Sequence, residues 1–238
     1  MSDEVQRYPS DRKVTEIGKA VAEAAIGSIP LIGGPLAVAL QYALGYRLAD
    51  RQEAWLNDLA AKVDLLMPGL DWQELVDEPP FVDAVVQATR AAAATSEQAK
   101  RQALRNGVLH VALGDAPTVD EQARFFRLVD EFTVAHMLLL DFFSEPRRAF
   151  ADAGRAWPNF LSSSKKAVFK EMLSPSQARD DEWLDLIFAD LERARLVNAS
   201  FSAMSSAGGL EQSNTTPLGE RFLAFIAAPP EPRQQTGS

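Results

Sequence analysis

The longest uncharged stretch of the chain, residues 24–46, is divided at its centre by prolines and glycines. Its middle reads IGSIPLIGGPL, in which Pro30 and Pro35 flank two adjacent glycines. A stretch of this length could cross a bilayer as one helix, but proline removes a backbone donor and glycine raises the entropic cost of helix formation. The pattern therefore predicts a helical hairpin, with arms over about 14–28 and 36–64, rather than a simple transmembrane helix.

Two environments suit this apolar hairpin, and the sequence leaves both open. In the first, the hairpin is buried in the core of a helical domain, with its Pro-Gly centre as the turn. In the second, it inserts into a membrane or lies on the membrane surface, and its small residues allow close helix contact. The side chains expected to contact a membrane or a partner are Ile29, Leu31, Ile32 and Leu36.

Apolar residues recur at helical spacing through residues 72–144, which predicts a bundle of helices without strands. A short amphipathic turn lies around Trp72, and a helix with an apolar face follows from Phe81. Residues of the type that cap helix N-termini predict three further helix starts: Ser96, Thr118 in a capping box with Glu121, and Thr133. The expected stops are Gly114 for the first of these helices and Glu145-Pro146 for the last.

The pattern changes after residue 195, where short Ser/Thr-rich segments replace helical spacing. Helices are expected over about 163–173 and 181–195, and a closing helix over 220–227. Between them, residues 196–203 and 210–215 predict two strands with a flexible tip, Ser205-Ser206-Ala207-Gly208-Gly209. This order of helices and hairpin is that of a winged-helix domain.

The expected fold class is therefore mainly α, with a helical bundle followed by a winged-helix-like α+β domain that contains a small β-hairpin. The expected parts are a flexible N-terminus over 1–11, the bundle over 12–145, the winged-helix-like domain over 146–228, and a tail over 229–238. The tail is polar and rich in proline, a composition typical of disorder.

The charge balance is acidic, with 24 Lys and Arg against 33 Asp and Glu and a net charge of −9. Nucleic-acid binding rests on clustered positive charge, so this balance argues against a nucleic-acid partner. The helix expected over 181–195 also begins with acidic residues, where a DNA-reading helix presents basic or amide side chains. The basic side chains kept as candidates for nucleic-acid or partner contact are Arg147, Arg148, Lys165, Lys166, Arg193 and Arg195.

The sequence contains no recognisable catalytic or cofactor-binding motif. It has no cysteine, no Walker loop, no GxGxxG, no HExxH and no GxSxG. The two histidines, His110 and His136, lie on separate expected helices, where a structural hydrogen bond is the simplest role. We therefore expect no catalytic residue, no cofactor, no metal site and no enzymatic activity.

Four stretches resemble, in their order and spacing, a widespread family of uncharacterised bacterial proteins. They are FVDAVVQATRAA, ALRNGVLHVAL, FFRLVDEFTVAHMLLLDFF and TTPLGERFLAFI. The likeness covers most of residues 20–227 and implies a helical body, led by a Pro/Gly-containing apolar hairpin, with a winged-helix-like module at the end. The family usually has Asn where His110 stands and an aromatic residue where Ala135 stands. Its general similarity to abortive-infection proteins implies a context in phage defence, but no activity.

The sequence thus predicts a non-enzymatic protein-interaction or regulatory protein of bacterial phage defence. The alternatives are a membrane-active effector that uses the hairpin over 24–46, and a winged-helix DNA-binding regulator. The expected partner is another protein, a second copy of this chain included, with a membrane as the alternative. The first twenty residues lack a secretion signal, so the expected location is the cytoplasm, with attachment to the inner membrane as the alternative.

Overall fold

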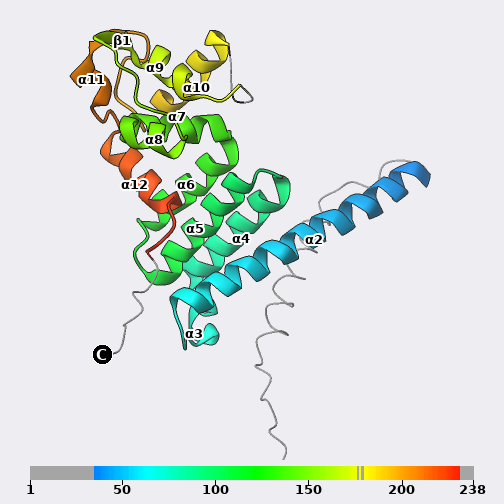
Figure 1. The fold of residues 1–238 in the computed structure, drawn as a ribbon. Helices are drawn as coiled ribbons and strands as arrows, with labels where there is room; N and C mark the ends of the chain where they lie inside the picture. The colour runs from blue at the N-terminus through cyan, green and yellow to red at the C-terminus, as the bar shows by residue number, and fades with distance from the viewer. Residues whose placement is uncertain (1–34, 176, 178–179, 231–238) are drawn as a thin grey trace, which may run out of the picture. The chain divides into compact units, whose positions relative to one another are not determined.

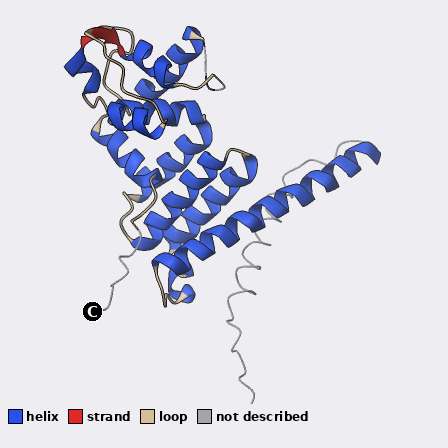
Figure 2. Cartoon of the chain, in the orientation of Figure 1, coloured by secondary structure: helices blue, strands red, loops and turns tan. Residues whose placement is uncertain are grey.

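The computed structural model describes residues 35–175, 177 and 180–230 of the chain. These residues form eleven helices and one two-stranded sheet (Figures 1 and 2), so the expectation of a mainly helical fold is confirmed. The expected helix over 14–28 lies outside the described residues, as do Ile29, Leu31 and Ile32. The expected N-terminal segment, 1–11, and most of the expected tail, 229–238, also lie outside them.

The chain falls into two compact units, which divide after Arg127. Unit 1 is Met1–Arg127 with Ala228–Ser238, and unit 2 is Leu128–Ala227. The boundary expected after residue 145 therefore falls inside unit 2.

Unit 1 is built on three helices that pack side by side: α2 (Pro35–Leu66), α4 (Pro79–Ala94) and α5 (Gln98–Leu113). The short helix α3 (Trp72–Val76) connects α2 to α4, and α6 (Val119–Glu131) follows α5 and ends in unit 2. The apolar faces expected from the sequence form the core: Trp55, Leu56, Leu59 and Val63 of α2, Phe81, Val85, Ala88 and Ala92 of α4, and Leu104 and Val108 of α5 are all buried.

Local capping explains two of these helix ends, the start of α3 and the end of α5. The Asp71 carboxylate accepts a bond from the backbone nitrogen of Gln73 at 2.8 Å, and Gly114 ends α5 in the left-handed conformation with φ 74°. Ser96 does not cap α5, contrary to the prediction. The N-cap position of α5 is Glu97, one residue later. Thr95 is the C-cap of α4, and its hydroxyl accepts a hydrogen bond from the backbone nitrogen of Glu97 at 3.1 Å.

Unit 2 surrounds an apolar helix, α7 (Val134–Ser144), which contacts α8 (Pro146–Asp152), α10 (Asp181–Arg193) and α12 (Pro217–Ile226). The remaining elements are β1 (Ser162–Ser164), α9 (Lys165–Met172), β2 (Met204–Ser206) and α11 (Ala207–Glu211). Helix α8 is not predicted from the sequence. Its Pro146 stops α7 as expected, but proline also suits the first turn of a helix, and here it begins a new one.

The expected β-hairpin takes a different form. Strand β2 pairs antiparallel with β1, with Ser162 opposite Ser206 and Ser164 opposite Met204. The two segments expected to pair, 196–203 and 210–215, meet only at the isolated bridge between Val197 and Thr215. The expected flexible tip forms the end of β2 and the start of α11, because the Ser206 hydroxyl caps that helix and Leu210 is buried at its end.

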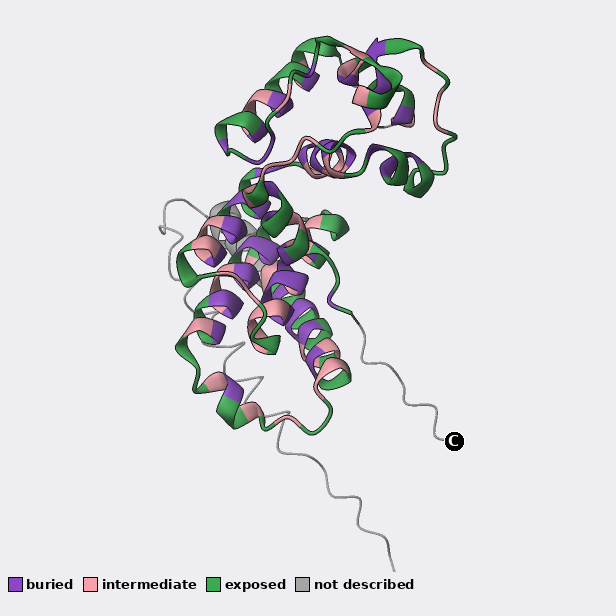
Figure 3. Cartoon of the chain, turned by 90° about the vertical axis from the view of Figure 1, so that its left-hand side faces the viewer, coloured by how far each residue is buried: buried purple, intermediate pink, exposed green. Residues whose placement is uncertain are grey.

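The core of unit 2 is aromatic. The rings of Phe142, Phe143, Phe150, Phe169, Phe188 and Phe201 form a connected cluster with centroid separations of 4.9 to 6.4 Å. Figure 3 shows buried positions running along the inner faces of the helices. This packing holds α7 at the centre of the unit and fixes the positions of the basic residues around it.

Candidate functional site

The basic residues singled out from the sequence lie on unit 2, and most of them are paired with carboxylates. Lys166 bonds Asp185 at 2.8 Å, and Arg193 bonds Asp190 at 2.6 Å. Lys170, the neighbour of Lys166 on α9, bonds Asp181 at 2.6 Å. Lys166 and Lys170 therefore pair with carboxylates near the start of α10, and the hydrogen bond from Lys170 lowers the pKa of the Asp181 carboxyl.

The two arginines of α8 are paired in the same way. Arg147 bonds Glu211 at 2.6 Å, and its guanidinium lies over the ring of Trp157. Arg148 lies within 4 Å of three carboxylates, those of Asp141, Glu145 and Asp152. These guanidinium groups are exposed, but neighbouring carboxylates balance their positive charge. Their electrostatic attraction for phosphate is therefore reduced.

Lys165 differs from the other basic residues because it is buried. The residue is 3 % exposed, and its ammonium group donates to the carbonyl oxygen of Gln212 at 2.6 Å. The rings of Phe142 and Phe143 lie 6.0 and 5.5 Å from its nitrogen. Burial disfavours the charged form and lowers the pKa of Lys165 to about 8. Its position at the start of α9 gave no sign of this burial in the sequence.

Arg195 has a backbone role that the sequence does not reveal. It follows α10 in the left-handed conformation with φ 63°, which is uncommon for a residue with a side chain. Its carbonyl oxygen accepts a bond from the Thr216 hydroxyl at 2.6 Å. This contact joins the end of α10 to the start of α12.

Both histidines are hydrogen-bonded within the fold. The Nδ1 of His136 accepts a bond from the backbone nitrogen of Thr133 at 3.1 Å, so its proton lies on Nε2, 3.4 Å from Asp190. The ring also stacks on Phe132. His110 lies 2.9 Å from Asp115, just past the end of α5. The carboxylate beside His136 belongs to Asp190, which lies 54 positions away in the chain.

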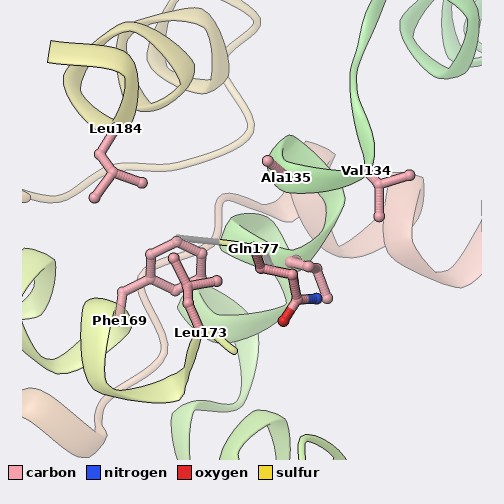
Figure 4. Close-up of a pocket in the computed structure, with 7 residues that line it drawn as sticks. Val134, Ala135, Phe169, Leu173, Gln177 and Leu184 are labelled. Carbon is pink, nitrogen blue, oxygen red and sulfur yellow. The ribbon is translucent and has the colours of Figure 1, made fainter. Parts of the chain in front are cut away.

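A small apolar cavity of about 80 Å³ lies in unit 2 (Figure 4). Its lining is Val134, Ala135 and Leu138 of α7, Phe169 and Leu173 at α9, Leu184 of α10, and Gln177. Sites for drug-sized ligands and cofactors are several times larger, at roughly 300–1,000 Å³. The volume therefore fits one aliphatic side chain better than a cofactor.

Unit 1 presents an apolar helix end. Residues 35–46, which we call the apolar end of α2, carry no charged side chain. No residue over 44–51 is buried, and Gln52 is the first buried residue in the part of α2 whose burial is described, from residue 44 onward. Figure 1 shows α2 in blue, continuing past the ends of α4 and α5. Leu36 lies in this part of the helix.

Over the described residues, no group of three or more His, Asp or Glu side chains is placed to hold a metal ion. None of the described helices combines the length and the apolar character needed to span a membrane.

Comparison of the chain with protein families, with curated proteins and with solved structures finds no match.

Proposed function

We propose that this protein is a non-enzymatic regulatory protein that acts by binding, with the apolar end of α2 as its attachment element and unit 2 as the contact for another protein. The observation that carries the proposal is the change in burial along α2. Its second half is buried against α4 and α5, whereas over 44–51 no residue is buried and Leu44 and Tyr46 are 47 % and 62 % exposed. Apolar surface at the end of a helix is costly in water, so it favours a binding role.

Unit 2 supports contact with a protein more than contact with nucleic acid. The order β1, α9, α10 and β2 supports assignment as a winged-helix-like module, and α10 would be its recognition helix. The lysines beside that helix are bound to its own carboxylates, and Lys165 is buried. The cavity at Ala135 has room for an aliphatic side chain of a partner. These features favour a protein surface as the target of unit 2.

The resemblance noted in the sequence supplies the biological context of the proposal, which is bacterial phage defence. The test is a plaque assay on bacteria that express the chain or one of two variants. Leu44→Asp places a charge on the apolar end of α2, and Leu65→Asp makes the same change at the far end of the same helix, where Leu65 is 51 % exposed. We expect the parent and Leu65→Asp to lower the plaque count, and Leu44→Asp to lose this effect at equal expression.

The nucleic-acid alternative is tested by a gel shift at low salt with the parent and with the double variant Arg193→Glu, Arg195→Glu. We expect no shift for either protein. A salt-dependent shift of the parent that the double variant loses would replace the proposal with a DNA-binding regulator. Turnover of nucleotides, nucleic acids or peptide bonds by the purified protein would also contradict the proposal.

A further inference from the structure

The apolar end of α2 has the length of one bilayer leaflet. Residues 35–46 are twelve residues of helix, and at 1.5 Å per residue they extend over about 18 Å. One leaflet contributes about 15 Å to the hydrocarbon core of a bilayer. The helix is therefore long enough to enter one leaflet, in keeping with the finding that no described helix could span both.

The residues that follow have the order found at a membrane surface. Tyr46 ends the uncharged stretch and is 62 % exposed, and Arg47 comes directly after it. Aromatic side chains with a polar tip favour the level of the lipid headgroups, and arginine favours their anionic phosphates. Arg47 and Arg51 lie one helical turn apart and are both exposed, and the exposed Asp50 between them leaves a local charge of about +1.

The uncharged stretch also continues beyond the described structure. Residues 24–34 lie immediately before α2 and contain no charged side chain, while Glu23 precedes them. The apolar end of α2 is thus the described part of a longer uncharged run, 24–46, that ends at Tyr46 within α2. A lipid surface would accept the described part of this run, residues 35–46, without requiring a partner shaped to fit it.

We propose that the apolar end of α2 inserts into one leaflet of an anionic membrane, with Tyr46, Arg47 and Arg51 at the headgroups. The inference rests on the proposed function, because it names the surface to which the attachment element binds. In this arrangement the buried half of α2, from Gln52 onward, stays packed in unit 1. Insertion therefore requires no change in the packing of α2 against α4 and α5.

The test is flotation of the full chain with vesicles of phosphatidylglycerol and phosphatidylcholine, and with vesicles of phosphatidylcholine alone. We expect the parent to float with the anionic vesicles and to bind the neutral ones about fivefold more weakly, since one basic charge near the surface contributes about 1 kcal/mol. Leu44→Asp should reduce binding by about tenfold or more, because a carboxylate is costly in hydrocarbon. Leu65→Asp should bind as the parent does.

Circular dichroism of both variants verifies that each keeps its helices, so that a loss of binding is not a loss of folding. A fluorescent reporter, Tyr46→Trp, gives a second readout that does not depend on the folding of Leu44→Asp, and its emission is read as the difference from the parent, which has four tryptophans of its own. Its emission should be quenched by lipids brominated near the headgroup and much less by lipids brominated at the chain end. A reporter with unchanged emission on addition of vesicles overturns the inference.

The outcomes separate this inference from the proposed function. If the parent stays unbound, or if Leu44→Asp and Leu65→Asp float equally well, insertion into lipid is overturned. If in that case Leu44→Asp alone still loses the plaque phenotype, the apolar end of α2 binds a protein and the proposed function stands. If Leu44→Asp changes neither flotation nor phenotype, both fail.

Discussion

At the scale of single residues, Lys165 shows how a charge can be kept inside an aromatic core. The carbonyl oxygen of Gln212 and the faces of Phe142 and Phe143 replace part of the water that the ammonium group loses. The replacement is incomplete, because burial still lowers the pKa of Lys165 to about 8 from an ordinary value of 10.5. Folding therefore opposes the charged form of this residue.

This balance predicts how stability depends on pH. Between pH 8 and 10.5 the unfolded chain holds a proton on Lys165 that the folded chain has released, so stability rises with pH. Between pH 7 and 9.5 the parent should gain about 2 kcal/mol relative to Lys165→Met, which lacks the titrating group. Urea unfolding of both proteins at several pH values measures this difference. A constant difference across the range would show that Lys165 titrates alike in both states.

Gly219 is a second residue with a specific requirement. A β-carbon at this position in α12 would clash with the carbonyl oxygen of Leu196, whereas a β-carbon at Gly208 in α11 would meet nothing within 4 Å. Gly219→Ala should lower the free energy of unfolding by about 1–3 kcal/mol, despite the better helix propensity of alanine.

The matched control is Gly208→Ala, which should leave the free energy of unfolding unchanged or raise it by up to about 1 kcal/mol. Denaturant titration of both variants compares them directly. Equal effects of the two substitutions would contradict the close approach of α12 to Leu196.

At the scale of helices, His136 joins two elements of unit 2. It fixes the first turn of α7 through the backbone nitrogen of Thr133, and it reaches α10 through Asp190, which also binds Arg193. His136→Ala should therefore cost about 2–4 kcal/mol, from lost hydrogen bonds and a cavity beside Phe132.

His110→Ala serves as the comparison, because the contact of His110 with Asp115 is local, five positions along the chain at the end of α5. It should cost less than about 1 kcal/mol. Thermal unfolding of the two variants compares the stability that each one loses. If His110→Ala were the more damaging change, the link between α7 and α10 would not depend on His136.

Helix positions could largely be predicted from the sequence, because apolar spacing and capping residues act over one or two turns. The expected arm over 36–64 is α2 (Pro35–Leu66), and Thr133 caps α7 as expected. The β-hairpin could not be predicted, because its pairing depends on a distant segment: β2 finds its partner in β1, about forty residues earlier. The Ser, Thr and Gly content after residue 195 indicated only that the helical pattern ends in this part of the chain.

At the scale of the whole molecule, the pairing of charges could not be read from the sequence. The net charge of −9 indicates an acidic protein, but it does not show that Lys166 and Lys170 are held by the carboxylates of α10. The burial of Lys165 also depends on tertiary packing, since Gln212 lies 47 positions away in the chain. By contrast, the uncharged run over 24–46 marked the apolar end of α2 directly.

We propose that the first half of α2 is an attachment element and not part of the core of unit 1. Amide hydrogen exchange along α2, with and without anionic vesicles, tests it most directly. In the free protein, amides over 44–51 should exchange much faster than those over 55–63, which lie in the buried half of the helix. Vesicles should then protect residues 44–46 and leave 55–63 unchanged. Slow exchange over both halves of α2 in the free protein would contradict the account.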